Sequence, residues 1–566
     1  MGTNNIIVRE YLESLAEKNE LDYIFPLLLS LKGFKIIRTP KETQGLQQFG
    51  KDVIAVGKDG DGVTKRFYFE LKGESDQDIT SESIYKKDGI NDSLLEMSYV
   101  PFKDSAIPGF NTLPSKCILV HNGVIRANAL PVFDGIVDRI FPNGGFERWD
   151  IHRLTTEFSD HLFNEYLLTD AENIKLFKRT LVLLNAPDYD LQDWSMLLDR
   201  LLGNNADIKK RAFSKMFATL NLLGYIIHHY SAEEHNLEPA RKGVHMLVLK
   251  TWAWVLKHGL EKKPAVQKVF NHLLDTQYRV LNDYFRRTLP VARLIDGIFS
   301  EKGGPYENVG YSLRSMDYLG NLVYFFLLRH HLPAGGGRIS PLDKKRLEKV
   351  QKKLMFEVID ANIGCRRPLL DRHSRPILLV ALFILQCEEV TKADKIKLHN
   401  YLADIFNNII LLKAMRGFFP EFTDNLGALI EHMATNERPD EYIDSSSMLI
   451  MILFELLTLF DTDSFYKSAL SEIGELPDLQ TAYPHAPGQD IELLFFSGVI
   501  HDHMAVESRI KLPEKLSDFK AFILSRPTFP VTFRTDLAGY PFLKWLPVLY
   551  YHNDIFPQFW RQYIQP

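Results

Sequence analysis

The first 150 residues change repeatedly between the hydrophobic periods of helices and strands. Residues 10–33 carry apolar side chains every three or four positions, which predicts a helix that Pro26 starts anew or kinks and that Gly33 ends. Three short runs rich in β-branched and aromatic residues predict three sequential strands at 34–40, 51–59 and 66–73. The turn sequence GKDGDG separates the last two, so these two strands are expected to form a hairpin.

The same segment continues with two more predicted strands and the helices that connect them. A polar stretch at 74–98 is helical or loose, and residues 114–123 form a further strand that ends at Asn-Gly. An amphipathic helix at 127–141 and a last strand at 146–154 follow. The order helix, three strands, helix, strand, helix, strand is typical of a small α/β sheet with helices on its faces.

From about residue 155 onward the pattern is helical throughout. Roughly 400 residues show helical apolar spacing, broken by short Gly, Pro or Asp connections, which predicts an all-α, irregular helical array. No fixed-period repeat is visible. We therefore expect an α/β domain at 1–155 and a helical region at 156–566, with a further division near 301–340 left open.

Length and charge narrow the class of protein. A chain of 566 residues is too long for one hydrophobic core, so at least two domains are expected. The net charge of −5 and the pI of about 6.4 exclude a basic nucleic-acid-binding module. Any contact with nucleic acid must then be made by a local groove.

Cysteine usage and the longest apolar stretch indicate a cytoplasmic protein without membrane contact. The three cysteines lie far apart and lack metal-ligand spacing, which favours reduced thiols, and the N-terminus has no secretion signal. The stretch at 446–460 contains Glu455 and is shorter than the ~20 residues of a membrane span. A buried core helix is the better interpretation.

Two carboxylates and a lysine are expected to meet on the predicted hairpin. Asp52 begins one strand, while Glu70 and Lys72 point to the same side of the next strand because side chains alternate with period two. Hard oxygen ligands hold Mg²⁺ or Mn²⁺, which polarises a phosphoryl oxygen and acidifies a bound water. Lys72 would orient or deprotonate that water, or neutralise charge on the phosphate.

A solvated face of an edge strand is the competing interpretation of Glu70 and Lys72. The alternate positions Phe67, Phe69 and Leu71 are apolar, which makes that face core. The opposite face, with Glu70 and Lys72, is then expected to line a cleft.

The motif Gly50-x-Asp52, followed 18 residues after the Asp by Glu70-x-Lys72, resembles the PD-(D/E)xK superfamily of restriction-endonuclease-like nucleases, and most closely its Mrr-like branch. The resemblance covers about 130 residues and implies a restriction-endonuclease-like fold for the first domain. It also implies a metal-dependent endonuclease that uses Mg²⁺, with Mn²⁺ as an alternative. Duplex DNA is the favoured substrate, because this branch mostly cuts DNA although some members act on RNA.

The resemblance also implies roles for further residues. The metal ligands would be Asp52, Glu70, the backbone carbonyl of Leu71 and an acidic residue of the first helix, for which Asp22 or Glu20 is the match. The pair before Gly50, Gln47 and Gln48, would face the phosphate together with Gly50.

Three segments of the helical region carry candidate chemistry of less specific kinds. The loop at 365–376 contains Arg366 and Arg367, whose guanidinium forks suit phosphate, although an ion-paired or solvated loop is favoured. A His-Asp-His sequence at 501–503 suits a metal, but histidines of a helix end or core are the better interpretation. The aromatic-rich segment 540–566 is expected to pack onto the helical array, with a partner-binding surface as the alternative.

Two functions follow from these observations. The first is a nuclease effector whose helical region senses, scaffolds or oligomerises, an architecture similar to that of bacterial anti-phage defence proteins. Such a protein would act as a homo-oligomer or with a partner protein, since cutting both strands takes two sites. The second is a helical interaction protein whose nuclease-like domain binds nucleic acid or a partner without cutting. The intact set of Asp52, Glu70 and Lys72 favours catalysis.

Overall fold

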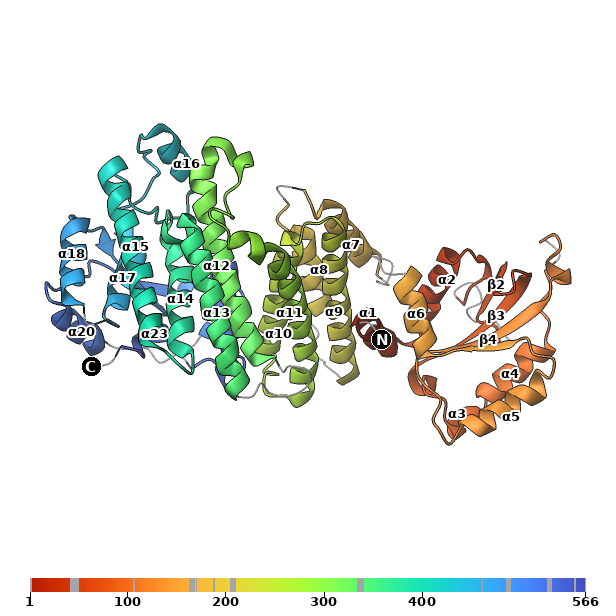
Figure 1. Ribbon diagram of the computed structural model, residues 1–566. Coiled ribbons are helices and arrows are strands. Elements are labelled where there is room, and N and C mark those ends of the chain that lie inside the picture. The colour runs from red at the N-terminus through yellow and green to blue at the C-terminus, as the bar shows by residue number, and fades with distance from the viewer. Residues whose placement is uncertain are drawn as a thin grey trace. The chain divides into compact units, whose positions relative to one another are not determined.

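The computed structural model (Figure 1) describes most of the chain and divides it into two compact units. The described residues are 3–40, 50–104, 107–161, 168, 170–186, 189–203, 210–332, 341–460, 462–484, 490–526, 532–553 and 556–564. The first unit comprises 1–243 with 268–273, and the second comprises 244–267 with 274–566. The division lies well beyond the expected boundary at 155/156, and it does not coincide with the segment 301–340.

A five-stranded mixed sheet forms the centre of the N-terminal domain, residues 3–161. Its strands follow the chain in the order β1-β2-β3-β4-β5, with bounds Lys35–Arg38, Val53–Lys58, Thr64–Lys72, Ser115–His121 and Phe146–Trp149. The first three strands pair antiparallel, whereas β3 with β4 and β4 with β5 pair parallel. The predicted element order and the β2–β3 hairpin are therefore confirmed.

Helices cover both faces of this sheet (Figure 1). The helices and helical turns of the domain, in chain order, are α1 (Thr3–Ser14), the π-helical turn η1 (Glu17–Leu21), α2 (Asp22–Leu31), the 3₁₀ turn η2 (Glu74–Asp76), α3 (Ser81–Tyr85), α4 (Ile90–Tyr99), the 3₁₀ turn η3 (Phe110–Thr112), α5 (Leu130–Ile140) and α6 (Ile151–His161). Helix α1 packs against α6 and α9 and not on the sheet. On one face, Phe25 of α2 packs edge-on against Phe69 at 5.2 Å between ring centroids. On the other face, Ile54 and Tyr68 pack against Met97 of α4.

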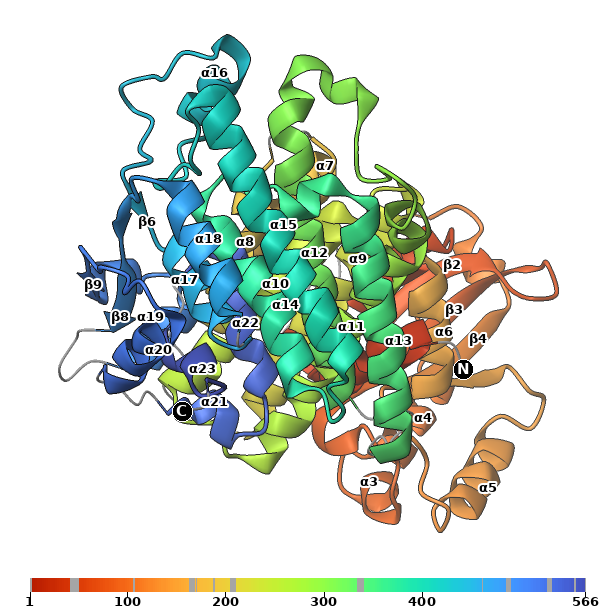
Figure 2. The same ribbon diagram turned by 60° about the vertical axis from the view of Figure 1, so that its left-hand side comes forward.

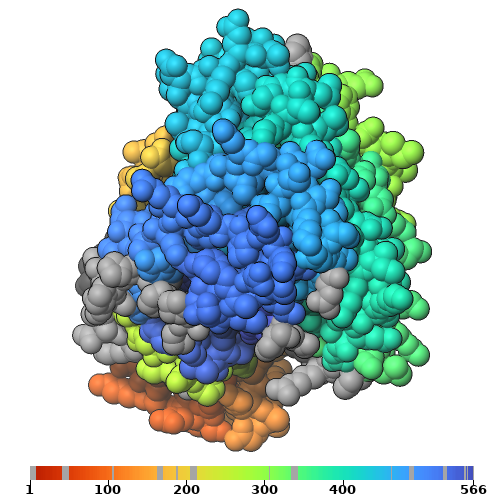
Figure 3. All heavy atoms as spheres, turned by 90° about the vertical axis from the view of Figure 1, so that its left-hand side faces the viewer, coloured from red at the N-terminus to blue at the C-terminus, as the bar shows by residue number. Residues whose placement is uncertain are grey.

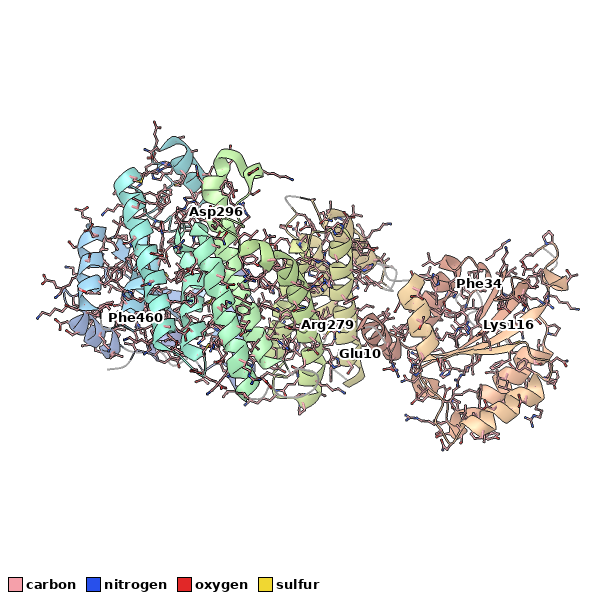
Figure 4. The ribbon with its side chains drawn as sticks, in the orientation of Figure 1. Glu10, Phe34, Lys116, Arg279, Asp296 and Phe460 are labelled. Carbon is pink, nitrogen blue, oxygen red and sulfur yellow. The ribbon has the colours of Figure 1, made fainter. Side chains whose placement is uncertain are left out.

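The face of β3 that carries Phe67, Phe69 and Leu71 is core, as the alternation predicts, because these side chains are at most 2% exposed. Phe34, labelled in Figure 4, extends this core with a ring 5.1 Å from that of Phe67. The opposite face is also covered over most of its length, since Tyr68 is only 3% exposed. Polar side chains of this face lie at the two ends of the strand, Thr64 and Arg66 at its start and Glu70 and Lys72 at its end.

The predicted strand at 146–154 is half wrong, because β5 ends at Trp149 and α6 begins at Ile151. Asp150 explains the change, since its Oδ1 accepts hydrogen bonds from the N–H groups of His152 and Arg153, each at 3.1 Å. A carboxylate in this position satisfies the free N–H groups at the start of a helix. The aromatic run before Asp150 hid this cap in the sequence.

Five longer helices follow the sheet domain: α7 (Ala171–Leu183), α8 (Gln192–Leu202), α9 (Lys210–Glu233), α10 (Glu238–Lys257) and α11 (Pro264–Ala292). Helices α7 to α9 belong entirely to the first unit, while α10 and α11 contribute residues to both units. Trp194 of α8 is fully buried and its indole N–H donates to the carbonyl of Gly243 at 3.0 Å. The first unit is thus larger than the α/β domain expected at 1–155.

The second unit is mainly helical. Its longer helices are α12 (Glu307–His331), α13 (Pro341–Ala361), α14 (Ser374–Gln386), α15 (Lys392–Arg416), α16 (Leu426–Thr435), α17 (Leu449–Leu457), α18 (Asp463–Ile473) and α20 (Leu516–Ser525). Shorter ones are η5 (Glu301–Tyr306), η6 (Ile363–Arg366), η7 (Asp371–His373), α19 (Ile491–Phe496), η8 (His501–His503), α21 (Arg534–Leu537), η9 (Pro541–Lys544), α22 (Trp545–Tyr550) and α23 (Gln558–Arg561).

Two small sheets correct the expectation of an all-α C-terminal region. Strands β6 (Ser446–Ser447) and β7 (Asp478–Leu479) pair parallel, and β8 (Thr481–Pro484) and β9 (Met504–Glu507) pair antiparallel. These runs are two to four residues long, too short for a period of two to stand out from the helical pattern.

Helix α17 lies within the apolar stretch 446–460, and all nine of its residues are buried, which confirms the predicted core helix. Its Glu455 is paired with Arg561, whose Nη2 lies 2.6 Å from Glu455 Oε1, and the Trp560 indole donates to Glu455 Oε2 at 2.7 Å. Among the helices of the described residues, none combines the length and the apolar character that a membrane crossing requires.

Candidate functional site

Asp52 lies directly before β2 and makes hydrogen bonds to Phe69 and Leu71, the two residues of β3 that flank Glu70. Its backbone N–H donates to the carbonyl of Phe69 at 2.8 Å, and its Oδ2 accepts from the N–H of Leu71 at 2.7 Å. The hairpin therefore brings Asp52 beside Glu70, as the sequence predicts. Because the N–H and C=O groups of a strand residue point to the same edge, the Leu71 carbonyl faces the Asp52 side as well.

Glu70 and Lys72 form an ion pair at the end of β3. Lys72 Nζ lies 2.6 Å from Glu70 Oε1, and the side chains of Lys72 and Glu70 are 13% and 5% exposed. Burial works to lower the pKa of Lys72, but the carboxylates of Glu70 and Glu17 outweigh it, so this pKa is raised above its ordinary value. Lys72 is therefore a cation at neutral pH, suited to bind negative charge rather than to accept a proton.

Glu17 of the π-helical turn η1 supplies a third carboxylate to this strand end. Its Oε2 accepts a hydrogen bond from the N–H of Gly73 at 3.0 Å. Gly73 permits this approach, since a Cβ built there would lie 2.9 Å from the Glu17 nitrogen and 3.1 Å from its Cα. Burial raises the pKa of Glu17; Lys72 lowers it and Glu70 adds to the rise.

Glu17 is thus an acidic residue of the first helical segment that hydrogen-bonds to this strand end, while the assignment of Asp22 or Glu20, to which the sequence resemblance points, stays a prediction. Glu20 caps its own turn, because its Oε2 accepts from the N–H of Ala16 at 2.6 Å and its other oxygen pairs with Lys215. Asp22 begins α2 and is half-buried. The π-helical turn, closed by the Leu21 N–H on the Ala16 carbonyl at 3.0 Å, shifts the helical register on which the expectation depended.

Burial and two neighbouring carboxylates raise the pKa of Asp52 well above its ordinary value. Burial is the largest cause, the charge of Glu70 follows, and Glu17 adds to them, while the Leu71 N–H and Lys72 act in the opposite direction. Negative charge is therefore in excess around Asp52. A cation bound at this place would reduce the repulsion and favour the ionised form of Asp52.

Two basic side chains that the sequence did not single out, Lys51 and His121, lie next to the residues Asp52, Glu70 and Lys72 in the sequence or in the sheet. Lys51 is 3% exposed, its Nζ donates to the carbonyl of Glu96 at 3.2 Å, and burial lowers its pKa, an effect that Glu70 partly offsets. His121 lies opposite Lys72 in the parallel pairing of β3 with β4. The sequence placed His121 near the end of the predicted strand 114–123, but it did not show that this strand lies beside the one that carries Lys72.

His121 is fully buried, and its environment defines its proton state. Its Nδ1 lies 2.9 Å from the carbonyl of Gln77, and its Nε2 has no hydrogen-bond partner within the part of the chain that the structure describes. Burial lowers the pKa of His121 to about 4, so the ring is neutral at pH 7. With the proton on Nδ1, Nε2 is left as an acceptor.

The donor set at this strand end fits a hard divalent cation. Asp52, Glu70 and the Leu71 carbonyl offer oxygen ligands, which Mg²⁺ prefers, and the raised pKa of Asp52 reflects the charge that such an ion would neutralise. The described residues contain no set of three His, Cys, Asp or Glu side chains already arranged to hold a metal. A site with two carboxylates and a backbone oxygen is compatible with Mg²⁺, which usually keeps several water ligands.

Gly50, expected to face a phosphate, packs tightly against α4. It adopts φ +65°, and a Cβ there would lie 2.2 Å from the carbonyl oxygen of Ser93, so this packing requires glycine. The contact also fixes the chain two residues before Asp52. Gln47 and Gln48, expected beside Gly50, lie outside the described residues.

Arg366 and Arg367 are far from this site in the sequence and belong to the second unit. Arg366 Nη1 pairs with Asp404 at 2.9 Å, and Arg367 donates to the Ser312 hydroxyl at 3.1 Å and to the Asn308 carbonyl at 2.9 Å. These contacts support the ion-paired interpretation of this loop.

Comparison with known proteins places the chain in no family. No protein-family model, no curated protein and no solved structure matches it. The interpretation of the site therefore depends on its own residues and their chemistry.

Proposed function

We propose that the N-terminal domain is a metal-dependent nuclease of the PD-(D/E)xK type, which hydrolyses phosphodiester bonds. The observation that carries this proposal is the position of Asp52, hydrogen-bonded to the residues on both sides of Glu70, with the Glu70–Lys72 pair and Glu17 next to it. A mixed sheet with its hairpin before two parallel strands supports a restriction-endonuclease-like fold.

The proposed chemistry assigns each group a separate task. Asp52, Glu70 and the Leu71 carbonyl would hold Mg²⁺, which acts as a Lewis acid on the phosphoryl oxygen and lowers the pKa of a bound water. Lys72, held as a cation by Glu70, would stabilise negative charge that develops on the phosphate. Glu17 hydrogen-bonds the backbone directly after Lys72 and so positions that lysine.

Duplex DNA is the substrate we propose, and the helical region is the part that would regulate cutting. The net charge of −5 supports weak affinity for nucleic acid in the resting state. A role in anti-phage defence, with a homo-oligomer or a partner protein, follows by analogy of architecture alone.

Cleavage of supercoiled plasmid, linear duplex and structured RNA by the purified full chain tests this proposal. Each substrate is incubated with Mg²⁺, Mn²⁺ or EDTA. We expect metal-dependent cutting that falls by about 10²–10⁴-fold in Asp52→Asn and in Lys72→Ala, the range typical for loss of one catalytic group.

Matched control variants separate the site from the surrounding domain. Asp61→Asn changes a carboxylate in the turn of the same hairpin, and Lys86→Ala removes a lysine whose ion-pair partner is Asp76. Both controls should retain full activity. Equal activity in Asp52→Asn and wild type would contradict the assignment of the site.

Binding without cutting is the alternative function, and the ion pair between Lys72 and Glu70 is the observation that favours it, because that pair already neutralises one carboxylate. Calorimetric titration with Mn²⁺ distinguishes the two when no substrate is cut. Binding of Mn²⁺ by wild type and not by Asp52→Asn would indicate an enzyme that awaits its trigger. Absence of Mn²⁺ binding, with retained affinity for nucleic acid, would indicate a binding domain.

A further inference from the structure

A cavity of about 570 Å³ lies within the second unit. Its walls come from η7 and the start of α14, the start of α17, strands β8 and β9, and the segment around α23. Figure 2 shows these elements close together, and Figure 3 shows the face that the C-terminal residues form. A volume of this size is within the range of small-molecule sites in proteins.

Three sequence segments that the nuclease proposal does not use meet at this cavity. Arg372 and Arg375 come from the arginine-rich loop, His501 comes from the His-Asp-His sequence, and Tyr551, His552 and Trp560 come from the aromatic C-terminal segment. The arginine-rich loop and the His-Asp-His sequence are far apart along the chain. Their convergence with the C-terminal segment gives the cavity basic and aromatic groups together.

The charges that face the cavity favour an anion. Arg375 is held in place, because its Nε donates to the carbonyl of Asn553 at 2.9 Å. Burial lowers the pKa of His552 to about 3, and the positive charges of Arg372, Arg375 and His501 contribute to the fall. Two arginines and two histidines of the lining therefore lie near one another, and an anionic ligand would interact favourably with the arginines.

Two carboxylates also line the cavity, and both have partners. Asp371 accepts hydrogen bonds from Ser447 Oγ at 2.6 Å and from the N–H groups of Met448 and Leu449 at 3.0 and 3.1 Å, so its charge is used at the start of α17. Asp424 Oδ2 lies 3.6 Å from Arg372 Nη1. Asp371 is therefore engaged within the fold, whereas Asp424 and Arg372 partly offset each other's charge.

The buried polar atoms of the lining that have no hydrogen-bond partner within the described residues include one hydroxyl oxygen and one carboxylate oxygen. These two oxygens are the hydroxyl Oγ1 of Thr481, a residue that is 7% exposed, and Oδ1 of Asp424. Buried polar atoms are seldom left unsatisfied in native proteins, and a ligand is one reason for such exceptions. Thr481 can donate to a ligand oxygen, and Asp424 can accept from a ligand hydroxyl or amino group.

The aromatic part of the lining is suited to a planar ring. Phe422, Tyr551 and Trp560 contribute to the walls, and the Trp560 indole is fixed by its hydrogen bond to Glu455 at 2.7 Å. We propose that this cavity binds a phosphorylated small molecule with a planar heterocycle, of mononucleotide size. Arginine forks match the phosphate, Thr481 and Asp424 supply polar contacts, and the aromatic rings face the heterocycle.

Isothermal titration calorimetry on the full chain tests this site with AMP, GMP, CMP and UMP, with inorganic phosphate and with adenosine as separate probes. We expect at least one nucleotide to saturate one site per chain with a Kd below about 1 mM, and phosphate or adenosine alone to bind at least about tenfold more weakly. The proposal is independent of the nuclease, so Asp52→Asn should bind the nucleotide as wild type does.

Thr481→Val and Arg372→Gln are the informative variants, and Arg366→Gln is the matched control from the same arginine-rich segment. Thr481→Val removes a hydroxyl whose oxygen makes no hydrogen bond within the described residues, so the thermal midpoint of the ligand-free protein should not fall, while nucleotide affinity should drop about tenfold. Arg372→Gln should weaken binding as well, and Arg366→Gln should not. Absence of binding by every probe, or equal losses in Arg366→Gln and Arg372→Gln, would overturn the proposal.

Discussion

The sheet domain and the helical second unit both bury carboxylates, but they neutralise them to different degrees. In the second unit Glu455 receives two hydrogen bonds from Arg561 and one from Trp560. In the sheet domain Glu17, Asp52 and Glu70 surround Lys72, which is paired with Glu70. A buried charge that is matched one for one stabilises a fold, whereas an excess of one sign indicates a place for a ligand of the other sign.

The cavity of the second unit extends this comparison to the opposite sign. Burial raises the pKa of Asp52 and the charge of Glu70 adds to the rise, while burial lowers the pKa of His552 to about 3 and nearby positive charge contributes to the fall. The two sites would thus take a cation and an anion respectively. Variants at each site can be compared with variants at paired charges, such as Glu455 with Arg561.

The largest effect on stability is expected at the neutralised pair. Arg561→Met leaves Glu455 buried without its cation and should lower the free energy of unfolding by about 3–5 kcal/mol. Urea denaturation of the full chain measures this change. Arg438→Met, which breaks the exposed pair with Asp444, is the control and should cost about 1 kcal/mol or less. Similar losses in the two variants would show that Glu455 does not depend on Arg561.

A smaller effect of opposite sign is expected at the carboxylate cluster. The pKa of Asp52 is raised in the folded protein, so ionisation of Asp52 above that pKa lowers stability. Asp52→Asn should therefore raise the free energy of unfolding at pH 8 by on the order of 1 kcal/mol, and it should also remove the nuclease activity that we propose. The gain should fade as the pH falls through the folded-state pKa of Asp52. If Asp52→Asn is less stable than the wild type at pH 8, the inferred excess of negative charge around Asp52 is wrong.

A further effect, seen only as a change of slope with pH, concerns His552. In the unfolded chain a histidine takes up its proton near pH 6.5, but folded His552 does so only at about 3, so stability is lost as the pH falls below about 6.5. His552→Asn should remove up to about 1 kcal/mol of this loss per pH unit. Thermal melts between pH 7 and pH 5 measure the slope.

The control for His552→Asn is His235→Asn, because both histidines have positive φ, +54° and +56°, which asparagine tolerates. His235 is exposed, so its replacement should leave the slope unchanged. If the two variants change the slope equally, His552 does not experience the positive potential that we infer.

Much of the sheet domain could be predicted from the sequence because its signals are local. Alternation along β3 identified Phe67, Phe69 and Leu71 as core, and the short turn identified the hairpin that brings Asp52 beside Glu70. The prediction of a strand failed at Asp150, where a local cap begins a helix. The π-helical turn that carries Glu17 was not predicted. Neither the cap nor the turn changes the hydrophobic period on which the prediction depended.

The second unit was less predictable because its polar lining comes from distant segments. Arg372, His501 and Trp560 each had a plausible local role, and only the folded chain brings them to one cavity. Short strands such as β8 and β9 lack the length at which a period of two can be recognised. Spacing along the chain carries no information about such convergence.

Trp560 donates a hydrogen bond to Glu455 and also lines the cavity. Ligand binding in the cavity is therefore linked to the attachment of the C-terminal segment to α17. A ligand that packs on this indole would favour the state in which the C-terminal segment is attached to α17. By thermodynamic reciprocity, attachment of that segment sets the affinity for the ligand by the same factor. Amide hydrogens of residues 556–564 should therefore exchange more slowly when the cavity is filled, and the affinity should fall when Arg561 no longer holds Glu455.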